Sequence, residues 1–197
     1  MPARSRSQSL TRDEIVDASL RLIEKHGLAR LTMRAVAAEV GVTPMALYYH
    51  IEGKEELFRL VVAEVSSQWL PLQLGDQGWE YSLRQHLISQ WEVLTRYPGL
   101  GSYLIAQPTL GVTSTALNNG VRFFEEAGFD PSQAPLAWSF AMTYLHGRLS
   151  VDARLWHLAE APRVEGLHAH DYVNFGVEAV IQGLSSMTLS HSPPSEV

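Results

Sequence analysis

The residues best suited to chemistry lie in one short stretch, Thr-Pro-Met-Ala-Leu-Tyr-Tyr-His at positions 43–50. Tyrosine hydroxyls and a histidine ring can hydrogen-bond to phosphate oxygens, and the methyl groups of Met45 and Ala46 can contact thymine. If Leu47 is the single buried anchor of a short helix, the other side chains of the stretch are free to contact a duplex. The alternative is that Tyr48 or Tyr49 packs against the first helix. Both together fit that alternative less well, because neighbouring residues of a helix point to different sides.

The flanking residues predict a helix, a tight turn and a second short helix. Thr32 can cap the first of these helices, and Gly41 ends it. Thr43 then caps the next helix, with Pro44 at the first position, where a missing N–H costs nothing. This helix-turn-helix arrangement places its second helix in the DNA major groove.

The remaining sequence predicts an all-α protein with about nine helices. Thr11 and Glu14 form a capping box for the first helix, and Gly27 is expected to end it in the left-handed conformation. Apolar residues at helical spacing mark further helices, which we expect at about 54–70, 79–96, 100–106, 113–127, 132–156 and 172–186. We expect a helix-turn-helix, DNA-binding domain at 1–60, with a disordered arm at 1–10, and a second helical domain at 61–197.

Composition narrows the classes of protein that fit. The 197 residues are 46% hydrophobic and 18% charged, with no cysteine and a net charge of −6. Residues 1–60 carry 9 Lys and Arg against 8 Asp and Glu, whereas the remainder carries 6 against 13. The asymmetry favours a nucleic-acid-binding end and an acidic body. No apolar run reaches the roughly 18 residues of a membrane span, and the first ten residues lack a signal core, so a cytoplasmic protein without a membrane partner is expected.

Residues 31–58 resemble the DNA-binding domain of TetR-family transcriptional repressors. The matching features are the threonine before the second helix, the Ala-x-x-x-Gly-Val turn, Leu-Tyr-Tyr-His and the lysine that opens the fourth helix. Gly53 departs from the family's usual Asn, Ser or Asp, but glycine is a tolerable cap. Thr32 is expected to meet phosphate or to cap its helix, and Arg34 is the expected guanine reader. The resemblance implies DNA contacts from Thr32, Arg34, Thr43, Pro44, Met45, Tyr48, Tyr49, His50 and Lys54.

The second half resembles the tetracycline-repressor type of C-terminal domain. That resemblance implies a pocket for an effector. The large aromatic residues of the body, including all five tryptophans, favour an apolar or aromatic effector, bound without a cofactor. For each single residue, core packing or surface exposure is the competing interpretation. The expected ligand-binding residues are His86, Gln90, Trp91, Tyr103, Gln107, Asn118, Phe124, Trp138 and Met142. His146 fits either a pocket or an interface. The segments 133–156 and 172–186 are apolar on nearly all sides, which favours a homodimer interface that includes Val180 and Ile181.

Three functions remain open. The first is a DNA-binding regulator, a repressor released from a palindromic operator by a small molecule. The second is a DNA-binding dimer with no effector. The third is a small all-α enzyme, for which the sequence offers no nucleophile elbow, phosphate loop or dinucleotide motif. His-Ala-His-Asp at 168–171 is a weak metal signal, and we expect neither a metal nor catalysis.

Overall fold

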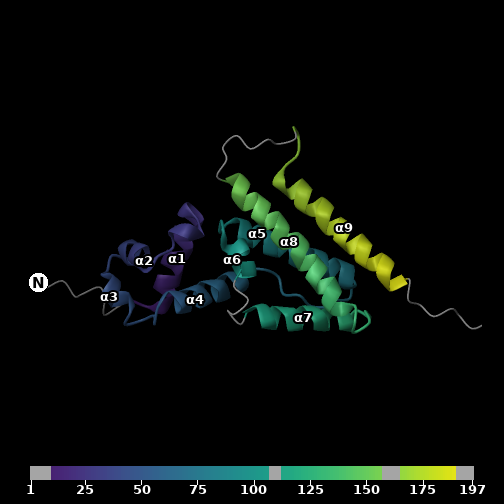
Figure 1. Cartoon of the computed structure of the whole chain (residues 1–197), viewed down its shortest axis with the longest axis horizontal. Helices are drawn as coiled ribbons and strands as arrows, with labels where there is room; N and C mark the ends of the chain where they lie inside the picture. The colour runs from purple at the N-terminus through teal and green to yellow at the C-terminus, as the bar shows by residue number, and fades with distance from the viewer. Residues whose placement is uncertain (1–9, 107–111, 157–164, 190–197) are drawn as a thin grey trace, which may run out of the picture. The chain divides into compact units, whose positions relative to one another are not determined.

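The computed structural model describes residues 10–106, 112–156 and 165–189, and within them every regular element is helical (Figure 1). The all-α prediction is confirmed. The helices are α1 (Arg12–His26), the 3-10 turn η2 (Leu28–Arg30), α2 (Met33–Val40), α3 (Pro44–Leu47), α4 (Lys54–Ser66), α5 (Trp79–Thr95), α6 (Leu100–Ala106), α7 (Val112–Glu126), α8 (Ala134–Trp156) and α9 (Ala169–Leu189).

The chain forms two compact units, and α5 contributes to both. The first unit comprises residues 1–68 and 93–101, and the second comprises 69–92 and 102–197. The boundary expected at residue 60 falls inside α4. In the first unit, α1, α2, α3 and α4 bury one apolar core, whose completely buried members include Ile15, Ile23, Val36, Leu47, Leu57 and Val61.

Residues 93–101 complete the first unit by packing on the end of α1. The Leu28 backbone N–H donates to the Pro98 carbonyl at 2.9 Å. A Cβ on Gly99 would lie 3.3 Å from the Leu28 Cβ, so the backbone approaches closely here. Arg96 and Tyr97 also donate to the Gln68 side chain, at 2.6 and 3.3 Å. The first unit is therefore assembled from two separate parts of the sequence.

Helix ends confirm some local expectations and correct others. Thr11 and Glu14 form both bonds of the capping box. Gly27 has a positive φ of 76° but a ψ of 162°, which is not the left-handed helical conformation expected of it. Its N–H still bonds to Ile23, so glycine is needed for the positive φ that turns the chain into η2. α4 ends at Ser66, four residues before the expected end.

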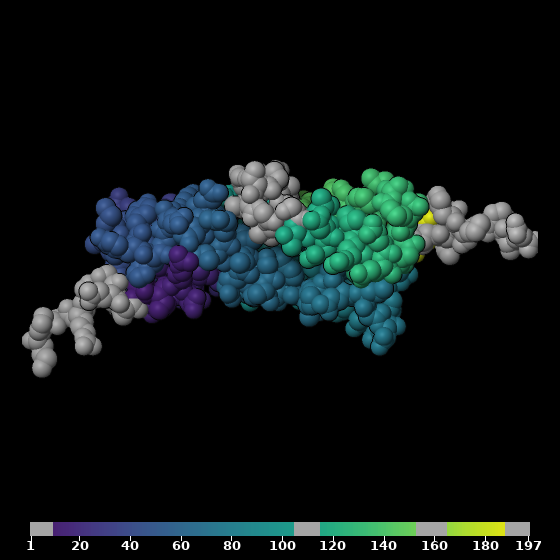
Figure 2. Space-filling model, turned by 90° about the horizontal axis from the view of Figure 1, so that it is seen from below, coloured from purple at the N-terminus to yellow at the C-terminus, as the bar shows by residue number. Residues whose placement is uncertain are grey.

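In the second unit, aromatic rings fill the space around the end of α7. The Phe124 side chain is completely buried. The Phe129 ring contacts Trp79 and Phe124 edge to face, with centroids 5.2 and 4.8 Å apart. Edge-to-face pairs are the geometry that ring quadrupoles favour. On the face shown in Figure 2, the green surface of α7 and the following turn is exposed, in keeping with the exposed residues 115–119.

α8 and α9 pack side by side along much of their length (Figure 1). The Tyr144 hydroxyl donates to the backbone carbonyls of Tyr172 and Val173, at 3.0 and 3.1 Å. A Cβ on Gly176 would overlap the Tyr144 ring, so glycine is required at this crossing. The close approach at Gly176 thus lies within one chain.

The expectation that Val180 and Ile181 lie in a dimer interface needs correction. Val180 and Ile181 are each only 3% exposed in the single chain, because they face the other helices of their own unit. Phe175, by contrast, is 80% exposed. The outward apolar side chains of α8 and α9 are Leu136, Phe140, Val151, Tyr172, Phe175 and Met187.

No helix in the described ranges is both long and apolar enough to cross a bilayer.

Candidate nucleic-acid interface and ligand-binding residues

The turn between α2 and α3 has the conformation that its sequence predicts. Gly41 adopts the left-handed conformation, with φ 74° and ψ 35°, and its N–H bonds back to the last turn of α2. The Thr43 side chain then accepts the Ala46 N–H at 3.3 Å, with Pro44 in the first helical turn. These two residues set the direction in which α3 leaves α2, and so aim the residues that follow.

α3 is shorter than expected and ends at Leu47. Leu47 is completely buried and anchors the segment, as the sequence indicates. Ala46 is also buried, so its methyl group is not available to a duplex. Tyr48 caps the helix, and Tyr49 and His50 lie in the turn that follows. The three polar rings therefore project from a turn.

Around α3, the side chains of Met45, Tyr48 and Tyr49 are exposed. Tyr49 is 83% exposed and Met45 is 68% exposed, which is unusual for such large apolar groups. Thr43 and Pro44 are exposed too, whereas His50 is half-buried. Neither tyrosine is buried against the first helix. The segment thus presents a cluster of rings and methyl groups to solvent.

Two residues beside α3 extend this surface. Arg34, in the first turn of α2, is exposed, and Thr32 accepts the Ala35 N–H at 3.1 Å as the helix cap. Lys54 opens α4 and places its ammonium group 5.2 Å from the centroid of the Phe58 ring. α4 begins after Gly53 without a side-chain cap, as expected from the glycine there. Two cations accordingly flank the exposed segment.

Arg12 holds the turn after α3, a role that the sequence analysis missed. Its Nε donates to the His50 carbonyl at 2.9 Å, and its Nη2 lies 3.1 Å from Glu56 Oε1. The other carboxylate oxygen of Glu56 accepts the Glu52 N–H at 2.5 Å. The pairing joins residues 38 positions apart, so no local pattern reveals it. Arg12 ties α1, the Tyr-Tyr-His turn and the start of α4 together.

In the second unit, His86 and Gln90 are buried polar residues one turn apart on α5. His86 Nδ1 lies 2.7 Å from the Leu70 carbonyl, and burial lowers the pKa of the ring. The Gln90 side chain is 8% exposed, and its Oε1 has no hydrogen-bond partner among the described residues. The Trp138 ring lies 6.3 Å from the His86 ring, between centroids. Of the residues expected at the ligand site, His86 thus lies near Trp138, and Gln90 is one helical turn from His86.

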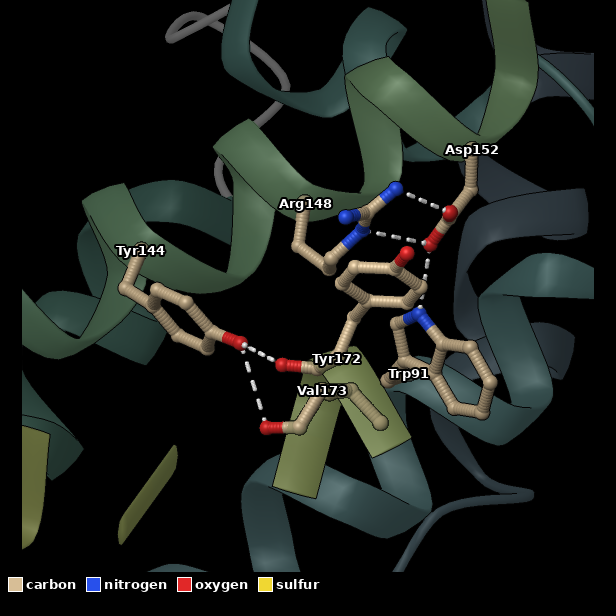
Figure 3. A network of polar contacts seen from close by, with 6 residues as sticks. All are labelled: Trp91, Tyr144, Arg148, Asp152, Tyr172 and Val173. Atoms are coloured by element: carbon tan, nitrogen blue, oxygen red, sulfur yellow. Dashed lines mark hydrogen bonds and ion pairs between the residues drawn. The ribbon is translucent and has the colours of Figure 1, made fainter. Parts of the chain in front are cut away.

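Trp91 belongs to a different environment, the polar network in Figure 3. Its indole N–H donates to Asp152 at 2.9 Å, and the same carboxylate takes two bonds from Arg148. The Arg148 guanidinium lies 5.6 Å from the centroid of the Tyr172 ring. This network joins α5, α8 and α9, so Trp91 has a structural role here, in keeping with the competing interpretation of core packing.

The other expected ligand-binding residues are scattered over the second unit. Phe124 is part of the aromatic cluster, Asn118 is exposed on α7, and Tyr103 and Met142 are half-buried. Gln107 lies outside the described residues. Burial lowers the pKa of the half-buried His146.

Two further features bear on what the second unit can bind. Arg84 of α5 pairs with both carboxylate oxygens of Glu178 of α9, and the hydrogen bond from Arg84 lowers the pKa of that carboxyl group. His170 lies 3.5 Å from Glu92, and its ring packs on Trp91. In the described part of the chain, no three His, Cys, Asp or Glu side chains come close enough to hold a metal.

Comparison with known proteins gives a consistent picture. Residues 15–61 match the family described as bacterial regulatory proteins, tetR family. The HTH-type transcriptional repressor DrrR1 of Streptomyces coeruleorubidus is 35% identical over 111 residues, which are 56% of this chain and 41% of that protein. The chain therefore spans less than half of that relative.

Solved structures share the fold over nearly the whole chain. BioQ bound to its double-stranded DNA operator aligns with a TM-score of 0.68 and 22% identity, over 90% of this chain and 99% of BioQ. A TetR variant of Acinetobacter baumannii in complex with minocycline aligns with a TM-score of 0.69 and 21% identity, over 91% and 98% of the two chains.

Proposed function

The chain belongs to the TetR family of bacterial regulatory proteins, and from that premise we propose that it is a sequence-specific DNA-binding repressor released from its operator by a small molecule. The observation that carries the proposal is the exposed cluster of Met45, Tyr48 and Tyr49 after a capped helix-turn-helix. Two exposed tyrosines and an exposed methionine within five residues are typical of a surface that a partner covers. DNA is that partner.

The residues divide into two roles at the duplex. Tyr48, Tyr49, His50 and Lys54 contact phosphates, because hydroxyl, imidazole and ammonium groups suit the backbone. Arg34 and Met45 face base edges, since a guanidinium can bind guanine through two bonds and a methionine can contact the thymine methyl group. Thr32 and Thr43 cap their helices and lie beside a phosphate. Pro44 sets the helix start.

The working form is a cytoplasmic homodimer, held by the outward faces of α8 and α9. Leu136, Phe140 and Val151 follow a helical spacing along α8, and Phe175 heads the exposed face of α9. Burying such a stripe against a second copy removes its apolar area from water. The dimer carries two helix-turn-helix units and so recognises a pseudopalindrome whose half-sites lie about one helical turn, roughly 34–36 Å, apart.

The effector binds in the second unit, at His86, Gln90 and Trp138. The complex of the Acinetobacter TetR variant with minocycline supports a small-molecule ligand for this fold. Release requires that the effector bind more tightly to the form that cannot hold the operator, since equal affinity for both forms would shift nothing. A regulator without an effector remains the second candidate, and no described cluster of residues favours an enzyme.

Selection of DNA from a random duplex pool, followed by footprinting, tests the proposal. We expect enrichment of a two-fold site and protection of both half-sites by the wild-type protein. The Tyr48→Ala and Tyr49→Ala variants should bind the same site more weakly, while Tyr81→Ala, which removes an exposed tyrosine of the second unit, should not change binding. Enrichment of no sequence, or protection of a single asymmetric half-site, would contradict the proposal.

A further inference from the structure

We propose that Gln90 and His86 form the polar end of the effector site and select an uncharged ligand whose ring bears an O–H or N–H donor. The inference rests on the proposed function, because it names the chemical class of the effector. It goes beyond an apolar or aromatic ligand by assigning the hydrogen bond that such a ligand must supply.

Gln90 is the first step of the argument. More than nine-tenths of its side chain is buried, yet Oε1 accepts no hydrogen bond from any described residue. A buried acceptor without a donor destabilises a folded protein, whereas an apolar side chain of similar size at the same position would not. A destabilising group of this kind is what a binding site retains when the donor arrives with the ligand.

His86 supplies a second acceptor on the same face of α5. A backbone carbonyl only accepts hydrogen bonds, so the ring nitrogen facing Leu70, Nδ1, carries the proton. Burial lowers the pKa of the ring and so favours its neutral form, in which Nε2 is an acceptor. His86 and Gln90 are four residues apart and therefore lie one above the other.

The ring of Trp138 provides the flat wall beside these acceptors. Its centroid lies 6.3 Å from that of the His86 ring, and it lies so close to Gly120 that a Cβ there would overlap the indole. α5, α7 and α8 thus bring an aromatic face and two acceptors together. An aromatic ligand can pack on the indole and donate to the acceptors. Anionic oxygen is disfavoured, since both acceptors would repel it.

Calorimetric titration of the full-length protein with a matched pair of probes tests this inference. The probes are 2-naphthol and 2-methylnaphthalene, which have nearly the same shape but differ in the hydroxyl donor. We expect 2-naphthol to bind roughly tenfold more tightly to the wild-type protein. Gln90→Leu should lose roughly tenfold in affinity for 2-naphthol and nothing for 2-methylnaphthalene. Gln85→Leu makes the same change at another glutamine of α5, five residues earlier, and should leave both affinities unchanged.

The thermal midpoint of unfolding gives an independent measurement. Gln90→Leu should unfold at a higher temperature than the wild type without ligand, because it removes the unpaired acceptor. A lowered midpoint together with unchanged affinity for 2-naphthol would show that Gln90 is satisfied by water alone, and would overturn the inference. Absence of any preference for 2-naphthol in the wild-type protein would overturn it as well.

The DNA-binding experiment distinguishes a failure of the ligand class from a failure of the proposed function. A protein that binds its two-fold site but shows no preference for 2-naphthol contradicts the ligand class and leaves the regulator intact. A protein that prefers 2-naphthol through Gln90 but selects no DNA sequence contradicts the proposed function and leaves the binding site intact.

Discussion

Replacing Gly176 with alanine should destabilise the second unit, although alanine is the better helix former. The new Cβ would overlap three atoms of the Tyr144 phenol ring, Oη, Cζ and Cε2. The ring cannot swing away without cost, because its hydroxyl donates to two carbonyls of α9. The substitution therefore sets a local gain in helix propensity against a steric conflict and a lost hydrogen bond.

The opposing contributions can be compared in free energy of unfolding. Alanine in place of glycine stabilises a helix interior by about 1 kcal/mol. Overpacking at a close contact typically costs about 1–3 kcal/mol. Losing the bond from the Tyr144 hydroxyl costs about 1 kcal/mol more. The net result is a loss of about 1–3 kcal/mol, opposite in sign to the propensity effect.

Urea denaturation at one fixed protein concentration measures this loss. Gly183→Ala is the matched control, because a Cβ at Gly183 on the same helix meets no atom within 4 Å. That control should gain up to about 1 kcal/mol. A Tyr144→Leu background should remove most of the cost of Gly176→Ala, since the obstructing ring is gone. An equal cost in both backgrounds would refute the explanation by steric overlap.

Three further predictions address the interface, the dimer and the pH dependence. Lys54→Ala should weaken operator binding and reduce the slope of log K against log salt concentration by about one. Arg34→Ala should instead reduce the preference for one base of the half-site by about 1–3 kcal/mol, and fluorescence anisotropy measures both effects. Phe175→Asp should give monomers in analytical ultracentrifugation because it charges the outward face of α9. If Phe175→Asp still formed dimers and Asn174→Asp, a charge at the preceding position, did not, the interface would lie elsewhere. Burial lowers the pKa of His86 and of His146, so the unfolded chain binds more protons than the folded one, and the free energy of unfolding should fall as pH drops below about 6.5. His86→Gln should make that decline less steep in denaturation experiments. An unchanged slope would argue against a contribution from His86.

Local signals predicted the first unit well, because its helix ends are written in adjacent residues. The capping box at Thr11, the left-handed Gly41 and the cap at Thr43 each depend on side chains within four positions. Gly27 shows the limit of such reasoning. Its positive φ was expected, but its ψ is set by the turn into η2. The N–H of Leu28, the first residue of η2, donates to the carbonyl of Pro98, 70 residues further along the chain.

The roles of residues in the second unit were harder to predict because they depend on distant partners. Trp91 looked like a pocket wall, but its partner Asp152 lies 61 positions away. The pairing of Arg84 with Glu178 spans 94 positions. Val180 and Ile181 show a different limit: periodicity identifies an apolar face but does not say whether its own chain or a second copy covers it. His86, Gln90 and Trp138 were predicted from residue type, and the structure brings them together without testing what they bind.

The two-part composition of the first unit has a consequence for how such proteins can exchange parts during evolution. A recombination event after residue 68 would transfer α1 to α4 into a new gene but leave residues 93–101 behind. The transferred segment would then lack Pro98, so the Leu28 N–H and the buried Leu28 side chain would face solvent. Because α5 runs without a break from Trp79 to Thr95, residues 93–101 cannot be moved without cutting a helix. Under the proposed function, DNA specificity is therefore more readily changed by substitutions around α3 than by exchange of the whole N-terminal segment.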